Sequence, residues 1–596
     1  MKQIAAIIAL FTGCIAALYG QEDAILNSAI NNIAKQLVLF PQEKIYLQTD
    51  KPYYITGEKI FFRAFLLDAF SNRQDTLSRY IYVELINPAD SVAQRVKIRR
   101  DSTYLFYGAI PLPENLPQGN YKIRAYTRYM QNQGESSFFS KQVRIGDPQM
   151  LKEKTNNSKY AEQTEKDFDV SFYPEGGQLI AGQLSNIAFK ALNSRGAALD
   201  ITGKIVDSKG NTVTELKTFH DGMGDFFINP LPEEHYRAVI QVKDEGYKVK
   251  EINLPMAQTN ALALKALIRN DKLLISINKP DSAFYPDLYL LIHSRGSIIY
   301  ANAYDSEKNY IALNTSIFPS GVSHIILLTK DLQIISERLV FLLNDDNGTA
   351  TFQTQKDSYH KRELVASKIQ LVDEKQKTLV AGNFSIAITN DKEVVIDTTT
   401  SILSGILLSS ELRGHIDNPE YYFQKGNKDA EQAADLLMKT NGWTRYAIPD
   451  IIQGKLSYPK IPFEQSQEIT GTVKSGLRLK QAKNVGVSLV SLNSGFLDEA
   501  KTDENGRYVF SNFEFPDSTK YVVQAMNSKG KSKQTAELYV DKDTFPKIHT
   551  TWTEPIVKKE KEKTDSVFID YVAKADQQYT FEHGMRMVNL PEVEVR

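Results

Sequence analysis

The stretch from Ser171 to Ala238 constrains the fold more strongly than any other part of the chain. It contains short runs in which apolar and polar residues alternate, such as the run from Asn186 to Lys190. Alternation with a period of two places one face of each run in a core, and glycine supplies the positive φ that tight hairpins require. The pattern therefore predicts a small antiparallel β-sandwich. Glycine-bearing turn signals separate the runs at 176–177, 195–196, 209–211 and 221–224.

Similar units precede and follow this stretch, so we predict an all-β protein built from tandem antiparallel β-sandwiches with one short helical insertion. A chain of 596 residues has room for about four to six domains of roughly 100 residues each. The predicted order is a signal peptide (1–20), an N-terminal helix (21–42), a first sandwich (43–148), a linker (149–167), second, third and fourth sandwiches (168–256, 257–346 and 347–465), a fifth sandwich (466–545) and a charged linker or tail (546–596).

The N-terminus has the composition of a secretory signal. Lys2 precedes an apolar run over 4–18 that is too short to span a bilayer, and a small residue, Gly20, stands before a polar segment. We expect cleavage after Gly20 and export of the chain. A lipoprotein signal is the alternative, because the residues before Cys14 loosely resemble a lipobox, although the apolar run continues beyond that cysteine.

Composition excludes several classes of function. Cys14 is the only cysteine, so the mature chain would have no disulfide, thiolate metal site, cysteine nucleophile or internal thioester. Lysine plus arginine (71) nearly balances aspartate plus glutamate (72). The net charge therefore produces no large electrostatic field that would favour binding to nucleic acid or to an anionic membrane. After the signal, the sequence has no run of the ~20 apolar residues that a membrane helix needs.

Two segments predict helices. The first runs from Asp23 to Gln36 with an apolar stripe, and we expect it to pack against the first sandwich. The second interrupts the fourth sandwich after its ordinary strands, which include Asn383 to Thr389. It begins with Asp429 and Gln432 in capping-box spacing. Asn441-Gly442 predicts that the helix ends at a residue with left-handed backbone conformation.

The most distinctive patch lies beside the second helix and contains two tyrosines, a tryptophan and an arginine. Aromatic side chains at such a place more often fill a core than form a ligand site, and we favour the core. The patch consists of Tyr421, Tyr422, Trp443 and Arg445.

No catalytic or metal-binding motif stands out. Ser528-Lys529-Gly530-Lys531 has the spacing Ser-x-x-Lys but has the composition of a hairpin tip, and Asp345-Asp346-Asn347-Gly348 is a turn rather than a complete calcium loop. We predict no catalytic residues, no metal and no cofactor, and the sequence leaves the ligand-binding residues unknown. No two of the eight histidines have ligand spacing; they are His220, His235, His293, His324, His360, His415, His549 and His583.

Motifs in three sandwiches carry family resemblances. In the first, TDKPYYITGEKIFFRAFLLD (Thr49–Asp68) and LPQGNYKIRAYTRYM (Leu116–Met130) resemble an early macroglobulin-type domain of alpha-2-macroglobulin-like proteins. In the second, FYPEGG (Phe172–Gly177) and HDGMG (His220–Gly224) resemble another domain of that group. In the fifth, GTV, VSLV and KTDENGRYVFSNF resemble the carboxypeptidase regulatory-like domain, a sandwich without carboxypeptidase chemistry of its own.

Together with SSELRGHIDNPEYYF and DLLMKTNGWTRY, these motifs resemble the macroglobulin-domain proteins of Bacteroidota that usually continue into a TonB-dependent receptor plug domain. This chain departs from that pattern by stopping at Arg596, where the plug would begin. The resemblance implies a non-enzymatic protein of the periplasm or outer membrane. It would serve as an accessory of an outer-membrane uptake or surface system, with an outer-membrane protein as partner and a peptide or polysaccharide as ligand.

Two other functions remain open. A macroglobulin-type protease inhibitor needs a cleavable bait segment, and no long bait loop or thioester cysteine stands out here. A hydrolase would need carboxylates or histidines from separate modules to meet in a cleft. Exposed edge strands of the sandwiches offer a further way to pair with a partner.

Overall fold

The fold is described from a computed structural model. The described residues are 23–75, 77–148, 167–194, 196–244, 246–280, 287–373, 375, 377–443, 445–475, 480–491, 495–515, 519–526, 536–548 and 566–574, with the backbone of 579–582 and 585–588. The predicted signal peptide with Cys14, most of the first linker, Ser528–Lys531, His549 and His583 lie outside them.

The predicted fold class is confirmed: strands arranged in several separate sheets are the main secondary structure, with a few short helices. Every described ladder is antiparallel except that between β2 and β8 of the first sandwich. The glycines of the predicted turns have the required backbone, since φ is 76° at Gly176, 86° at Gly210 and 74° at Gly222.

The first sandwich packs two sheets, ordered β1-β3-β6 and β2-β8-β7-β4-β5. Alternation in β3 directs Ile60, Phe62 and Ala64 into the core and Phe61 to solvent. Its strands are β1 (Glu43–Thr49), β2 (Tyr53–Ile55), β3 (Lys59–Asp68), β4 (Tyr80–Ile86), β5 (Val92–Arg99), β6 (Phe106–Pro111), β7 (Gly119–Tyr126) and β8 (Phe139–Gly146).

The second sandwich has the sheets β13-β10-β9 and β12-β11-β14-β15. Its strands are β9 (Phe168–Pro174), β10 (Ser185–Asn193), β11 (Ile201–Val206), β12 (Thr212–Lys217), β13 (Met223–Ile228), β14 (Arg237–Val242) and β15 (Lys250–Asn253).

The third sandwich has the sheets β16-β17-β20 and β19-β18-β21-β22. Its strands are β16 (Ala263–Arg269), β17 (Lys272–Asn278), β18 (Leu288–Ser294), β19 (Ser297–Ala303), β20 (Ile311–Asn314), β21 (Gly321–Thr329) and β22 (Ile334–Leu342).

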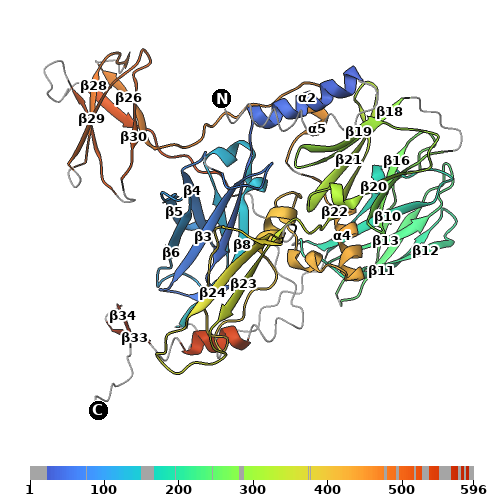
Figure 1. Ribbon diagram of the computed structural model, residues 1–596, viewed down its shortest axis with the longest axis horizontal. Coiled ribbons are helices and arrows are strands. Elements are labelled where there is room, and N and C mark those ends of the chain that lie inside the picture. The colour runs from blue at the N-terminus through green and yellow to red at the C-terminus, as the bar shows by residue number, and fades with distance from the viewer. Residues whose placement is uncertain are drawn as a thin grey trace.

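The predicted N-terminal helix is present as α2 (Ala24–Leu39), capped by the Asp23 carboxylate, but its expected packing partner is wrong. Its apolar stripe packs against the third sandwich and the short helix α5 (Ile448–Ile452) rather than the first sandwich. The reason lies in β18, in which every residue is buried. That strand has an apolar second face, and α2 covers it (Figure 1).

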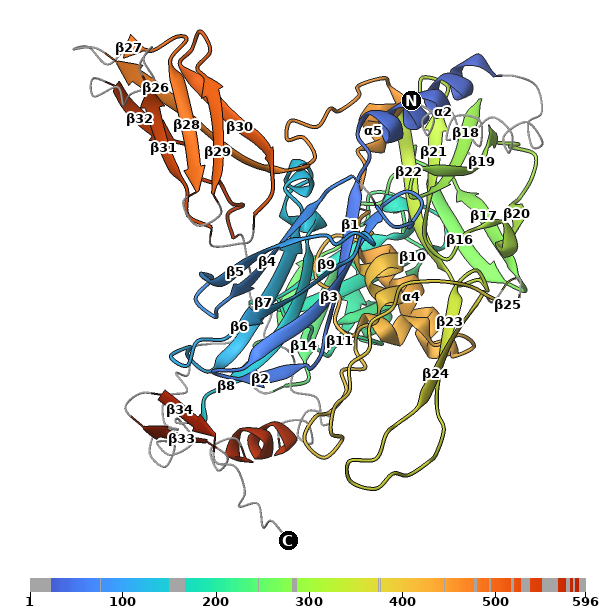
Figure 2. The same ribbon diagram turned by 60° about the vertical axis from the view of Figure 1, so that its left-hand side comes forward.

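The region predicted as a fourth sandwich contains one three-stranded sheet, made of β23 (Gly348–Thr354), β24 (Ser367–Asp373) and β25 (Thr378–Leu379). All seven residues of β23 are exposed, and the β23–β24 hairpin projects from the molecule (Figure 2). The predicted strand from Asn383 to Thr389 is not a strand. Its apolar residues alternate as in a strand, but none of the described strands pairs with them, and Ile388 is 91% exposed.

The helical insertion, residues 401–452, contains α3 (Ile402–Ser404), η6 (Gly405–Ser409), η7 (Pro419–Phe423), α4 (Lys428–Thr440) and α5. The cap of α4 is Asn427 rather than Asp429, because the Asn427 side chain accepts from two backbone amides of the first turn. The prediction that the helix ends at a left-handed residue is also wrong. Asn441 is extended (φ −119°), since the next residues bridge back to Leu412 and Arg413.

The fifth sandwich has its own core between the sheets β27-β26-β30, with β32 beside β26, and β29-β28-β31. Its strands are β26 (Gln467–Ser475), β27 (Lys480–Gln481), β28 (Gly486–Ser491), β29 (Phe496–Lys501), β30 (Arg507–Phe513), β31 (Val522–Met526) and β32 (Ala536–Val540).

The tail, expected as a charged linker, contains a helix at 566–574 and a hairpin of β33 (Tyr579–Glu582) and β34 (Met585–Val588). Phe568 and Val572 of that helix pack against Tyr53 of the first sandwich. Within the described part of the chain, no helix is both long and apolar enough to cross a membrane.

Candidate binding site at the junction of the first three sandwiches

The helical insertion lies where the first three sandwiches meet. Figure 1 shows α4 between the first sandwich and the second and third. On one face of α4, Ala433, Ala434 and Leu437 are buried with Met223 of the second sandwich and Leu339 of the third. The alanines leave room for close approach, so the insertion joins domains that are far apart in the sequence.

An ion network centred on a buried arginine fixes α4 to the second and third sandwiches. Arg338 of β22, 2% exposed, pairs with Glu175 of the second sandwich (Nε–Oε1 3.1 Å) and with Asp435 of α4 (Nη2–Oδ1 2.5 Å). Lys439 of α4 lies 2.8 Å from Asp435 as well. One arginine thereby links three parts of the chain.

A second network fixes the insertion to the first sandwich. Lys44 of β1 forms an ion pair with Glu411, and both side chains are 1% exposed. Arg445 Nε lies 3.6 Å from the same carboxylate, and Trp443 Nε1 donates to it at 3.1 Å. Lys44 Nζ also donates to the carbonyl of Ile406 at 3.2 Å.

Burial and neighbouring charges shift the pKa values in this second network. Burial lowers the pKa of Lys44 to about 7. Burial acts to raise the pKa of Glu411, but the surrounding cations, led by Lys44, hold it below its ordinary value. Glu411 is therefore the fixed anion of the junction, and removing it would leave buried cations without a counterion.

The aromatic patch predicted beside α4 fills part of the junction between the sandwiches. His220 of the second sandwich stacks on Tyr421 with ring centroids 4.1 Å apart, and Tyr422 is 3% exposed. Trp443 contacts the ring of His293 in the third sandwich at 4.8 Å.

The structure brings together two histidines that are distant in the sequence. His293 and His324 are register partners on β18 and β21, with ring centroids 5.1 Å apart. Burial lowers the pKa of His293 well below its ordinary value, so it packs as a neutral ring. Among the described residues, no three His, Cys, Asp or Glu side chains are placed to hold a metal ion.

The acidic motif at 345–348, predicted as a turn, bends the chain between β22 and β23. The Asp346 carboxylate accepts from the backbone N–H of Ser320 at 2.9 Å and from its hydroxyl. Asp345 pairs with Lys425 of the insertion at 2.7 Å. Protein donors thus engage both carboxylates.

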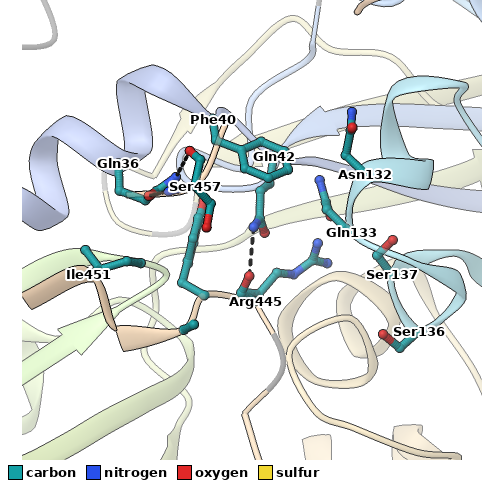
Figure 3. Close-up of a pocket in the computed structure, with 12 residues that line it drawn as sticks. Gln36, Phe40, Gln42, Asn132, Gln133, Ser136, Ser137, Arg445, Ile451 and Ser457 are labelled. Atoms are coloured by element: carbon teal, nitrogen blue, oxygen red, sulfur yellow. Dashed lines mark hydrogen bonds between the residues drawn. The ribbon is translucent and has the colours of Figure 1, made fainter. Parts of the chain in front are cut away.

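A polar pocket of about 160 Å³ lies at the junction (Figure 3). Gln42 Nε2 donates to the carbonyl of Arg445 at 2.7 Å, and Gln36 exchanges two hydrogen bonds with the backbone of Ser457. The amide atoms of Gln133 and Nη2 of Arg445 are buried without a protein partner. A cavity of this size has room for several water molecules. We interpret this pocket as a water-filled space within the junction.

A larger cavity of about 370 Å³, hereafter the groove, opens between the first sandwich and the insertion. Its floor consists of Phe65 and Leu67 from β3 with aliphatic side chains of the insertion. Asn and Gln side chains and Tyr104 line the remainder. The insertion contributes Ile402, Leu403, Ile406 and Leu407, and the amides are Asn72, Gln74, Asn347 and Asn383.

Glycine lets the insertion come close enough to form this floor. A Cβ on Gly405 would lie 2.7 Å from the ring of Tyr46 on β1, so only glycine fits there without displacing the ring. In the turn just before it, Ile402 (39%) and Leu403 (37%) remain exposed and line the groove. This site could not be found from the sequence, because its residues come from five separate segments with no shared motif.

Comparison with known proteins supports the macroglobulin resemblance of the first sandwich. Residues 44–145 match the family model of the MG2 domain. This match covers β1 to β8 almost completely. The chain therefore contains a macroglobulin-type domain.

Solved structures similar to the chain include alpha-2-macroglobulins. The Salmonella protein reacted with methylamine has 10% identity and a TM-score of 0.15 over 85% of this chain and 37% of its own. The Escherichia coli protein activated by porcine elastase has 8% identity and a TM-score of 0.20 over 84% and 43%. Dimeric latent PorU from Porphyromonas gingivalis has 12% identity and a TM-score of 0.22 over 48% and 32%.

The chain thus spans less than half the length of each of these structures. At such identities and TM-scores, the similarity carries no argument about activity, ligand or partner.

Proposed function

We propose that this chain is a non-catalytic binding scaffold exported to the cell envelope, where it serves an outer-membrane uptake or surface system of the TonB-dependent type. In this role it recruits an outer-membrane protein and presents a peptide or polysaccharide. The fifth sandwich acts as a carboxypeptidase regulatory-like spacer, in keeping with its sequence motifs.

The observation that carries the proposal is that the helical insertion fixes the MG2 domain relative to the second and third sandwiches. Two ion networks, centred on the buried side chains of Glu411 and Arg338, attach one insertion to three sandwiches. The exposed groove lies on this fixed frame. A rigid frame with an open apolar groove suits binding, because little ordering entropy is lost when a ligand docks.

The test is affinity purification of the tagged chain from native envelope membranes after mild cross-linking, followed by mass spectrometry. We expect an outer-membrane barrel protein or its surface partners to be recovered. Recovery of a protease instead, or of no envelope protein, would overturn the proposal.

A second candidate is a macroglobulin-type protease inhibitor, and one observation favours it. The loop 355–366 between β23 and β24 is exposed along most of its length and carries Lys361 and Arg362, which trypsin cleaves after. Incubation with trypsin followed by size-exclusion chromatography separates the two candidates. An inhibitor retains the protease after cleavage of this loop, whereas a scaffold is cut and the protease elutes alone.

A further inference from the structure

The groove has the chemistry of a site for an extended peptide. We infer that it binds a segment of a partner protein in β conformation, with apolar side chains alternating with acidic ones. This inference rests on the proposed scaffold function and names the class of ligand that the scaffold holds.

The floor of the groove fits aliphatic or aromatic side chains. At about 370 Å³ it exceeds twice the volume of an apolar cavity of roughly 150 Å³ that holds benzene. A leucine and a phenylalanine spaced two residues apart along a strand would therefore both be accommodated. Sugars stack on flat aromatic faces, and this floor is mainly aliphatic, so a peptide fits it better than a polysaccharide.

The side-chain amides around the groove suit the main chain of a peptide. Asn383 Nδ2 donates to Gln74 Oε1 at 3.3 Å, and Asn347 Nδ2 donates to Ser320 Oγ at 3.5 Å. Asn72 Oδ1 accepts from Lys44 at 3.2 Å. Each asparagine is thus held at one end, and its other amide atom makes no hydrogen bond with the described residues. A side-chain amide offers the same donor and acceptor as a peptide group.

The open sheet beside the groove favours an extended ligand. Asn347 directly precedes β23, and Asn383 follows β25 by four residues. The outer edge of β23 is unpaired among the described strands, as is that of β24 over 367–370. Unpaired edges provide main-chain donors and acceptors for an added strand.

One face of this sheet is apolar and partly uncovered, with the β23 side chains exposed and those of β24 half-buried. Phe352 of β23 is the register partner of Ile369 on β24, and Ala350 is that of Leu371, so these four side chains share a face. Phe352 is 55% exposed. An added strand with alternating apolar residues would extend this face, as the second sheet of a sandwich does.

Charge around the sheet selects the polar residues of the ligand. Residues 348–380 carry six lysines and arginines against four aspartates and glutamates. A strand whose polar positions are acidic complements this excess of positive charge.

The probe is a fluorescein-labelled peptide, acetyl-Glu-Leu-Glu-Phe-Glu-Leu-Glu-amide, titrated with the full mature chain and followed by fluorescence anisotropy. We expect saturable binding that the variant Leu403→Glu weakens at least tenfold, because it places a charge in the floor. The matched control is Leu497→Glu on β29 of the fifth sandwich, an exposed leucine (63%) outside the groove. This control should bind as the wild type does.

Two further measurements keep the test decisive. The same peptide N-methylated at phenylalanine keeps its side chains but loses a main-chain donor, and it should bind at least tenfold more weakly. Asn383→Ala, at an exposed position, serves if Leu403→Glu fails to fold and should also weaken binding.

Four results would overturn the inference: no binding of the peptide, equal binding by Leu403→Glu and Leu497→Glu, undiminished binding of the methylated peptide, or binding of cello-oligosaccharides in place of the peptide. If the peptide fails while cross-linking still recovers an envelope partner, the peptide site is wrong and the scaffold function stands. If the peptide binds but no envelope partner is recovered, the scaffold function is wrong.

Discussion

Glu43 should make the stability of the first sandwich depend on pH, and Glu43→Gln should remove that dependence. The carboxyl is 1% exposed at the start of β1, where one oxygen accepts from the Thr127 hydroxyl at 2.5 Å and Ser78 lies close by. Burial, with repulsion from Asp75, raises the pKa of Glu43 to about 8 from 4.5. The folded protein therefore keeps a proton that the unfolded chain loses.

The sign follows from which state binds the proton. Between pH 4.5 and about 8 the folded state holds more protons, so the contribution of Glu43 to stability is complete below 4.5 and is lost as pH rises through 8. These pKa values give a loss of about 2–3 kcal/mol in the free energy of unfolding between pH 6 and pH 9. Glutamine mimics the neutral carboxyl and does not titrate, so Glu43→Gln should not incur that loss.

The assay is urea unfolding at pH 6 and pH 9, followed by the fluorescence of Trp443 in the junction. Trp552, the other tryptophan, is replaced by phenylalanine in all proteins compared. Comparing Glu43→Gln with the wild type cancels the opposite contribution of Lys44, whose lowered pKa makes stability rise above pH 7. Glu114→Gln, at an exposed position, is the matched control. An equal difference between Glu43→Gln and the wild type at both pH values would refute the reasoning.

Three other tests, using five substitutions, examine the packing. Glu411→Gln removes the anion of the junction and should cost about 3–5 kcal/mol; an unchanged urea midpoint of Trp443 fluorescence would count against the buried network. Gly176→Ala should cost about 2–4 kcal/mol and Gly177→Ala about 1 kcal/mol, measured by hydrogen exchange of the second sandwich. Both have positive φ, but only at Gly176 would a Cβ meet backbone atoms, at 2.5 and 2.6 Å. Asn427→Ala should destabilise α4 by about 1 kcal/mol, whereas Asp429→Ala should cost less; equal exchange rates in α4 would contradict the cap.

Much of the fold was predictable because its signals are local. Alternation within a strand and glycine at a turn act over a few residues, which is why the turn glycines Gly176, Gly210 and Gly222 have the expected φ. The amphipathic stripe of α2 likewise predicted a helix. Such a stripe shows that one face of the helix must be buried, but it does not show which sandwich buries it. The expected packing partner was wrong for that reason.

The segment 383–389 is a second case in which a local sequence pattern did not predict the structure. Phe384, Ile386 and Ile388 alternate with smaller or polar residues as they would in a true strand, but all three are exposed and unpaired. A strand is stabilised by cross-strand neighbours, and its own sequence does not say whether they exist. The groove could not be predicted either, because its parts come from 64–74, 104–105, 347, 383 and 402–407.

The groove and the buried network of Glu411 depend on the same short segment. The Ile406 side chain lines the groove, while its carbonyl accepts a hydrogen bond from Lys44, the cation that pairs with Glu411. Gly405 beside it lies against Tyr46 of β1, so the segment cannot shift toward the first sandwich without a clash. The contacts that join the insertion to the MG2 domain therefore also set the shape of the groove floor. A ligand seated on that floor would contact side chains from both units at once, so its binding would favour the joined arrangement over any in which they separate.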